Sequence, residues 1–384
     1  MKYLGHAMKR GEPGIRIALH DRVSEISTFS DQFSVFEGVF GAHINLNSQV
    51  KSKIYDGSLF RFPLRNENCA RTSEIKKLAY SEAEMRQLLT KVEDSLDVLL
   101  LFTQNVAKFS VYELDSTCQD PRNQKLLFST HKSTNHPIKA VVDHANNNLQ
   151  RFSEYGLYAA QEKSHTNEID LTVTNQNAVS TKKWVIHSRD SCHETYEYAS
   201  KYPEEGLLPY CSLAFSLDNK DTKATRAVDG RLFCFLPLPI QNHLPAHVNA
   251  SFKINKDRLG LKYHTEDEKN FSFEQEDWND LISKDIGHAY YAILLFFKQK
   301  GISFDNFYNL FPNHTDVVKE HFSIICLAKL LQLCYEADDA IFPVNKDLWK
   351  TWENLRIFDS TVPCLLYTSP SPRDATLSRM PSSA

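Results

Sequence analysis

One stretch of this sequence, residues 231–261, constrains the fold more than any other. It reads RLFCFLPLPIQNHLPAHVNASFKINKDRLGL. The apolar start predicts a buried strand, and the Pro-Leu-Pro run predicts a corner because proline cannot donate to a strand ladder. The remainder predicts a second strand that runs into a basic loop. A second string, DGSLFRFPLR at residues 56–65, has apolar residues at near-alternating positions and also ends at a proline, which predicts another strand.

The pattern of the other segments predicts strands first and helices last. Ser81 and Glu84 form a capping box for a helix whose apolar face continues to Val106, and strands are expected at 109–112, 183–186 and 212–217. From Asp277, which can cap a helix that ends at Gly301, the pattern is helical, with a second helix after residue 315 and a short one at 349–355. Because strands precede helices, we expect an α+β fold rather than a doubly wound sheet.

Two segments lack such a pattern. Residues 116–180 are polar, and we interpret them as a long variable insertion with room for a short helix near 139–152. The last stretch, CLLYTSPSPRDATLSRMPSSA at 364–384, is rich in proline and serine and has no periodicity, so we expect it to be disordered. Its amino-acid sequence resembles translated sequencing-adapter DNA, so we do not expect it to contribute to the fold.

Composition excludes several classes of protein. The chain has 384 residues, 42% of them apolar, which is enough for two or three domains. Its formal net charge of −4 gives no general attraction to nucleic acid or to an anionic membrane. There is no long apolar run and no apolar leader, so we expect a soluble, cytoplasmic protein. The eight cysteines are scattered without a CxxC pair, which predicts reduced thiols and no metal site.

The sequence contains no constellation that predicts catalysis. It has no GxGxxG, GxxxxGK[ST], GxSxG or HExxH motif. His187 and His193 flank Arg189 and Asp190, yet no oriented partner can be named for them, and we interpret the group as solvated. The adjacent Glu204 and Glu205 are interpreted in the same way. We therefore do not expect this chain to be an enzyme.

The two strings named first carry a resemblance to a known family. Together with YLGHAMKRGEPGIRI at 3–17, DWNDLISKDIGHAYYAILLFFKQ at 277–299 and YNLFP at 308–312, they resemble the sacsin repeat, which is of the Hsp90-like (GHKL) ATPase type. The resemblance implies that residues 1–80 end an Hsp90-like ATPase domain whose nucleotide-pocket half is missing. It implies that residues 81–275 form an α+β, transducer-like middle domain and that residues 276–363 form a helical segment.

The resemblance also assigns four residues to nucleotide chemistry in an intact parent protein. Gly57 and Ser58 fall on the family's Gly-Thr pair, whose hydroxyl helps to position nucleotide. Lys256 and Arg258 are candidates for the basic residue that reaches the γ-phosphate from the middle domain, where a cation offsets developing charge. The chain departs from the family pattern at three positions, where glycine, glycine and a basic residue are expected: His243, Ala250 and Asp257.

The implied parent is a chaperone or co-chaperone in ATP-linked protein folding and quality control, with Hsp70-type chaperones and misfolded proteins as partners. The metal-binding helix, the DxGxG loop and the lid of the family do not occur before residue 56. We therefore expect this chain to bind no cofactor alone, while ATP and magnesium belong to an intact parent. Two alternatives remain open: a non-catalytic scaffold repeat that has lost nucleotide binding, and the rear half of an active GHKL ATPase.

Overall fold

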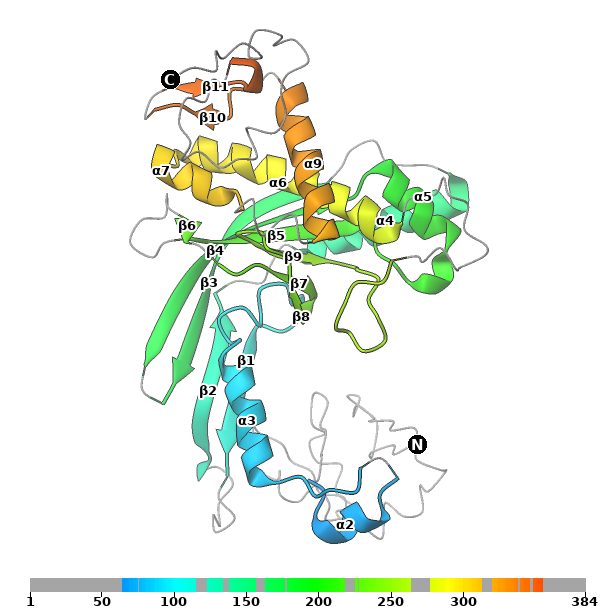
Figure 1. Cartoon of the computed structure of the whole chain (residues 1–384), viewed down its shortest axis with the longest axis vertical. Coiled ribbons are helices and arrows are strands. Elements are labelled where there is room, and N and C mark those ends of the chain that lie inside the picture. The colour runs from blue at the N-terminus through cyan, green and yellow to red at the C-terminus, as the bar shows by residue number, and fades with distance from the viewer. Residues whose placement is uncertain are drawn as a thin grey trace, which may run out of the picture. The chain divides into compact units, whose positions relative to one another are not determined.

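The computed structural model describes twelve segments of the chain (Figure 1): residues 64–74, 76–114, 123–133, 138–156, 163–176, 178–217, 225–226, 228–263, 277–312, 320–337, 339–345 and 348–354. The chain divides into two compact units. The first unit comprises residues up to Ser95 together with Ser110–Ser129 and Asn175–Asn177. The second unit comprises Leu96–Phe109, Thr130–Thr174 and the remainder from Ala178.

Helices α2 (Glu67–Thr72) and α3 (Glu82–Glu93) belong to the first unit. The predicted capping box of α3 is confirmed, because Ser81 Oγ accepts from the Glu84 amide at 3.2 Å and Glu84 Oε2 accepts from the Ser81 amide at 2.7 Å. The predicted length is wrong: α3 ends at Glu93, and none of its residues is buried. The following apolar residues form a series of turns in the second unit, where Leu96 is buried.

The described strands form a mixed sheet in the order β1-β2-β3-β4-β5-β9-β7-β8, with β6 paired to β5 and a separate pair β10-β11. The pairs β3-β4, β4-β5, β5-β9 and β7-β8 are antiparallel, whereas β7 and β9 run parallel. The bounds are β1 Lys108–Glu113, β2 Lys125–Lys132, β3 Ser164–Asn175, β4 Val179–Asp190, β5 Tyr210–Leu217, β6 Thr225–Arg226, β7 Arg231–Cys234, β8 Leu236–Gln241, β9 His247–Ala250, β10 Phe342–Pro343 and β11 Trp349–Lys350.

The helices of the second unit pack on the sheet and on one another. Their bounds, with those of the short 3-10 helices, are α4 Ile138–Tyr155, α5 His193–Lys201, η4 Pro203–Glu205, α6 Trp278–Lys300, α7 Phe304–Phe307, η5 Tyr308–Leu310, α9 His321–Glu336 and η6 Trp352–Asn354. Figure 1 shows α6 and α9 together on one side of strands β4 and β5. The predicted start and end of α6 are confirmed, since Asp277 caps it and Gly301 ends it at φ 76°.

Strand β5 lies between two hydrophobic clusters, and all of its residues are buried. Because side chains alternate along a strand, Leu213 and Phe215 join the cluster formed with α6 and α9, while Tyr210 and Ala214 join the cluster formed with α4. The second unit is thus a sheet covered by helices on both faces. The α+β class is confirmed, whereas the Hsp90-like assignment stays a prediction.

The structure corrects three further interpretations of the sequence. The Pro-Leu-Pro run at 237–239 lies inside strand β8 rather than at a corner. The helix expected near 139–152 is confirmed as α4. The rest of the segment 116–180 is not poorly patterned, because it contains β2 and β3, and β3 pairs with β4 over eleven residue pairs inside the main sheet. Its polarity misled the interpretation because α4 shows only one apolar face and β3 is mostly half-buried. The short helix expected at 349–355 is instead the strand β11 followed by the single turn η6.

Within the part of the chain that the structure describes, no helix is long and apolar enough to cross a membrane.

Candidate functional site

The four residues assigned to nucleotide chemistry fall into two pairs. Gly57 and Ser58 lie outside the described residues, so their role stays a prediction. Lys256 and Arg258 lie in the second unit, in the loop that follows β9. We call residues 253–262 the basic hairpin, because four of its ten residues are lysine or arginine and one is acidic.

Backbone hydrogen bonds define the basic hairpin. Ile254 and Leu261 form an antiparallel bridge, and the Lys262 amide donates to the Lys253 carbonyl at 2.9 Å. Nearer the tip, the Asn255 amide donates to the Gly260 carbonyl at 2.9 Å. The tip is therefore a short closed loop rather than an extended segment.

The tip presents two cations to solvent. Lys256 and Arg258 are both exposed, and neither side chain has a hydrogen bond or ion pair within the described segments. Arg258 has a φ of 60°, a left-handed conformation that is unusual for a residue with a Cβ. The Asp257 carboxylate accepts from the Leu259 amide at 2.9 Å, which stabilises this local turn. A tip closed by its own hydrogen bonds, whose two cations have no ion pair within the described segments, is suited to binding an anion.

Lys253, at the base of the basic hairpin, differs from the two tip cations because it is paired and mostly buried. Its side chain is 11% exposed, and Nζ lies 2.6 Å from Glu205 Oε2 and donates to the Tyr198 hydroxyl at 2.6 Å. Burial by itself would lower the pKa of Lys253, but the hydrogen bonds to Glu205 and Tyr198 outweigh it and raise the pKa. Lys253 is therefore a fixed, neutralised anchor. Glu205, which the sequence analysis interpreted as solvated, is its partner.

The first two residues of α6 contact the basic hairpin and the chain just before it. Asn279 is fully buried, and its side-chain amide group bonds to the backbone of both hairpin strands, at Lys253 and Lys262. Trp278 Nε1 donates to the Ser251 carbonyl at 2.7 Å, just before the hairpin. The sequence analysis recorded Trp278 and Asn279 only as part of a matching string. Their contacts could not be read from it, because they join residues more than fifteen positions apart.

A pocket of about 320 Å3 lies at the base of the basic hairpin. Apolar side chains and three charged ones line it together: Glu205, Leu207, Phe252, Lys253, Ile254, Lys262 and Tyr263. Burial raises the pKa of Tyr263, whose hydroxyl has no hydrogen-bond partner in the described structure. The pocket adjoins the base of the hairpin, while the two unpaired cations lie at its tip.

Two of the three departures from the family pattern, His243 and Asp257, have a structural consequence. His243 adopts φ 53°, a left-handed conformation that strains histidine but would not strain glycine. Ala250 is buried at the end of β9, and the Asp257 carboxylate places a negative charge beside Arg258. The first departure costs about 1 kcal/mol of strain. The last weakens the attraction of the tip for an anion.

In the group around Asp190, His187, Arg189 and Asp190 are buried, so the interpretation of the group as solvated is wrong for them; only His193 is exposed. Asp190 is fully buried, and its carboxylate accepts from His144 Nδ1 at 2.9 Å, from Asn148 Nδ2 at 3.0 Å and from the Tyr196 hydroxyl. Burial raises the pKa of Asp190, while these hydrogen bonds oppose the rise. The oriented partner comes from α4, which the sequence analysis placed in an insertion. The carboxylate joins β4 to α4 and α5.

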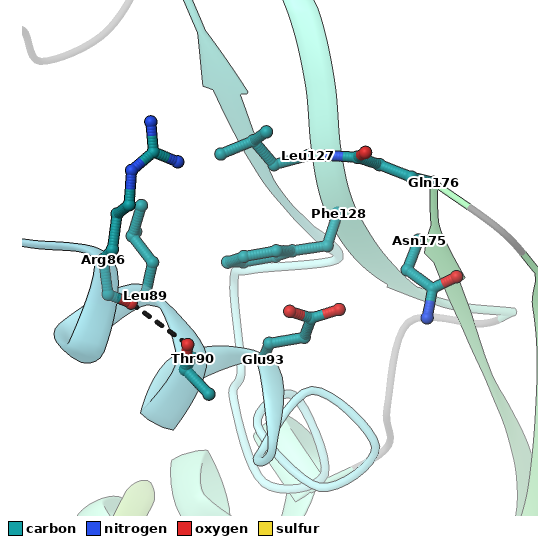
Figure 2. Close-up of a pocket in the computed structure, with 8 residues that line it drawn as sticks. All are labelled: Arg86, Leu89, Thr90, Glu93, Leu127, Phe128, Asn175 and Gln176. Atoms are coloured by element: carbon teal, nitrogen blue, oxygen red, sulfur yellow. Dashed lines mark hydrogen bonds between the residues drawn. The ribbon is translucent and has the colours of Figure 1, made fainter. Parts of the chain in front are cut away.

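The first unit has a separate pocket of about 370 Å3. Figure 2 shows Arg86, Glu93 and their neighbours on α3 opposite the Phe128 ring of β2. Arg86 is paired with Glu82 and Glu113, so its charge is already neutralised. The remaining residues that line this pocket are Leu89, Thr90, Leu127, Asn175 and Gln176. The arrangement shows no acid–base pair or nucleophile, and we assign no chemistry to it.

Comparisons with known proteins bear on the family of the chain. The family model described as the sacsin domain matches residues 1–126. Human sacsin is 27% identical over 323 residues, which is 78% of this chain and 6% of the human protein. No solved structure matches the chain. The resemblance to a fragment of a sacsin-like repeat is therefore confirmed, and the chain spans only a small part of the curated relative that it matches.

Proposed function

We propose that this sacsin-like chain is part of a chaperone or co-chaperone in ATP-linked cytosolic protein folding, and that its basic hairpin supplies cations to the terminal phosphate of a bound nucleotide. The chain by itself is not the catalyst. Nucleotide and magnesium bind to a preceding Hsp90-like segment of the intact protein. Hsp70-type chaperones and misfolded proteins are its partners.

The observation that carries the proposal is a hairpin tip closed by its own hydrogen bonds, with two exposed cations that have no ion pair among the residues that the structure describes. A flexible, solvated lysine loses conformational entropy when it binds an anion, whereas a tip closed by its own backbone hydrogen bonds loses less. A fixed cation also needs no rearrangement as charge develops on a transferred phosphoryl group. Lys253 and Asn279 fix the base of the same hairpin, which supports the positioning of Lys256 and Arg258.

A non-catalytic scaffold is the second candidate function, and the departures from the family pattern described above favour it. The Asp257 carboxylate lies within the tip, one residue from each proposed phosphate-binding cation, and opposes anion binding. In the scaffold function, the second unit binds Hsp70-type partners without nucleotide. Substitutions at the tip then leave partner binding and ATP turnover unchanged.

The test is a double substitution, Lys256→Ala with Arg258→Ala, in a longer protein whose preceding segment binds ATP. We expect kcat for ATP hydrolysis to fall about tenfold or more, with the KM for ATP unchanged, because the cations act mainly on charge that develops during transfer. Steady-state ATP turnover and binding of an Hsp70-type chaperone are measured on the same preparations.

A matched control is Lys139→Ala with Arg151→Ala on α4. This variant removes the same two residue types from exposed positions that have no ion pair within the described segments. It therefore reports any effect of net charge alone. Turnover that falls equally in both double variants, or in neither, contradicts the phosphate role. Retained Hsp70-type binding in that case supports the scaffold.

A further inference from the structure

Asn279 bonds to both strands of the basic hairpin at once. Its Oδ1 accepts from the Lys253 amide at 3.0 Å, and its Nδ2 donates to the Lys253 carbonyl at 2.9 Å and to the Lys262 carbonyl at 2.8 Å. One side chain thus satisfies three backbone groups on two strands. These groups flank the bridge that closes the hairpin.

The position of Asn279 is itself fixed by α6. The residue is fully buried in the first turn of the helix, its amide donates to the Asp277 cap at 3.3 Å, and its carbonyl accepts from Ser283 Oγ at 2.6 Å. A buried side chain in a helical first turn has few alternative rotamers. The basic hairpin is therefore attached to the N-terminus of a long helix rather than to a loop.

Helix α6 connects this attachment to the core of the second unit. It contributes Trp278, Ile282, Ile286 and further residues to the hydrophobic cluster shared with β5 and α9. At Gly287 an added Cβ would lie 2.8 Å from the Cys326 carbonyl oxygen, so α6 and α9 approach closely. A close-packed helix pair moves as a body rather than deforming locally. Displacement of the hairpin base is consequently transmitted to α6.

We infer that Asn279 is a positioning residue that couples the basic hairpin to α6, so that its hydrogen bonds hold Lys256 and Arg258 in place for the charge that develops on a nucleotide's terminal phosphate during transfer. The coupling half of this inference rests on the proposed function. Because the tip acts mainly on charge that develops during transfer, loss of the attachment to α6 weakens that effect without weakening the binding of ATP.

The first measurement is amide hydrogen exchange of the full 384-residue chain, read by NMR at Lys253 and Lys262. In Asn279→Ala we expect exchange at both amides to accelerate about tenfold or more, because one amide loses its acceptor and the other loses support for its strand. Asn279→Asp keeps the size of the side chain and the acceptor for the Lys253 amide but loses both donated bonds. We expect it to accelerate exchange at Lys262 more than at Lys253.

Asn242 provides the matched control. It is also a buried asparagine whose side chain accepts one backbone hydrogen bond, from Leu244, and donates two, to the carbonyls of Arg231 and Ala246. Asn242→Ala therefore removes the same set of bonds from a different loop. We expect it to leave exchange at the hairpin amides close to that of the unsubstituted chain. Equal acceleration in both alanine variants overturns the positioning role, since general loosening then accounts for it.

The second measurement is ATP turnover of the same variants in the longer protein. Asn279→Ala is expected to lower kcat toward that of the Lys256→Ala, Arg258→Ala variant without changing the KM for ATP, whereas Asn242→Ala is not. Faster exchange with unchanged kcat, while the tip variant lowers kcat, overturns the coupling and leaves the proposed function standing. An unchanged kcat in the tip variant overturns the proposed function and the phosphate coupling with it.

Discussion

Substitution of Gly230 by alanine tests whether the Asp-Gly pair before β7 is a conformational turn or a point of close packing. Gly230 is buried and does not have a positive φ. A Cβ at this position would lie 2.0 Å from Asn242 Oδ1, 2.3 Å from the Leu244 carbonyl oxygen and 2.4 Å from the Ala246 carbonyl oxygen. All three oxygens belong to the loop that leads into β9, and two of them are backbone atoms that cannot rotate away.

The sign of the effect separates the two explanations. If only conformation mattered, alanine at a negative φ would stabilise the protein by about 0.4–1 kcal/mol through the unfolded state. The steric contacts instead require the loop to move by about 1 Å, which costs about 1–3 kcal/mol for overpacking. They also break at least one buried hydrogen bond of Asn242, at about 1 kcal/mol. We expect a net loss of about 2–3 kcal/mol from the free energy of unfolding.

Urea unfolding followed by tryptophan fluorescence measures this loss, since Trp184 and Trp278 are both buried in the second unit. Gly156→Ala is the control, because Gly156 has φ 64° and nothing within 4 Å of an added Cβ. It should lose only about 1 kcal/mol of left-handed strain. A Gly230→Ala variant as stable as the unsubstituted protein, or more stable than Gly156→Ala, would refute the close-packing explanation.

Three further predictions concern other parts of the chain. Burial lowers the pKa of His187 and His247 to about 4, so the unfolded state binds more protons than the folded state between about pH 4 and 6.5. The free energy of unfolding should therefore fall as pH decreases through that range, by about 1.4 kcal/mol per pH unit for each histidine. A urea midpoint that does not change with pH in this range would contradict this prediction. Asp190→Ala leaves the donors around it, including Tyr196, without an acceptor, and should cost about 3 kcal/mol or more in urea unfolding, whereas Asp190→Asn should cost less. Ser81→Ala removes the α3 capping box and should lower the stability of this helix by about 1 kcal/mol. Amide exchange should then be faster in α3 and unchanged in α6.

Local sequence signals were reliable where the determining contacts are close in the chain. The capping box at Ser81, the cap at Asp277 and the left-handed end at Gly301 each depend on groups within a few residues, and each is confirmed. The end of α3 was missed for the opposite reason. Its apolar periodicity continues past Glu93, but the following residues bury their side chains as turns in the second unit, and packing overrides the periodic pattern.

The candidate site shows the same division. The string around 231–261 indicated a basic loop, and Lys256 and Arg258 do lie exposed at its tip. The residues that fix this loop, Lys253 and Asn279, were not identified as a unit. No nearby residue in the sequence identifies them, because Lys253 pairs with Glu205 and Asn279 bonds to the backbone of the basic hairpin.

The sequence alone determined the class of this protein: its family resemblance, its α+β character, the ends of its principal helix and the presence of a basic loop. These properties follow from short-range patterns of apolar residues, caps and turns, which act within a few positions. Only the tertiary structure decided which polar groups are buried and paired. Asp190 became the partner of α4 and α5, and Asn279 became the attachment of the basic hairpin. A buried polar group bonds to whichever partners the fold places beside it. Because those partners lie far away in the sequence, no local sequence pattern predicts them.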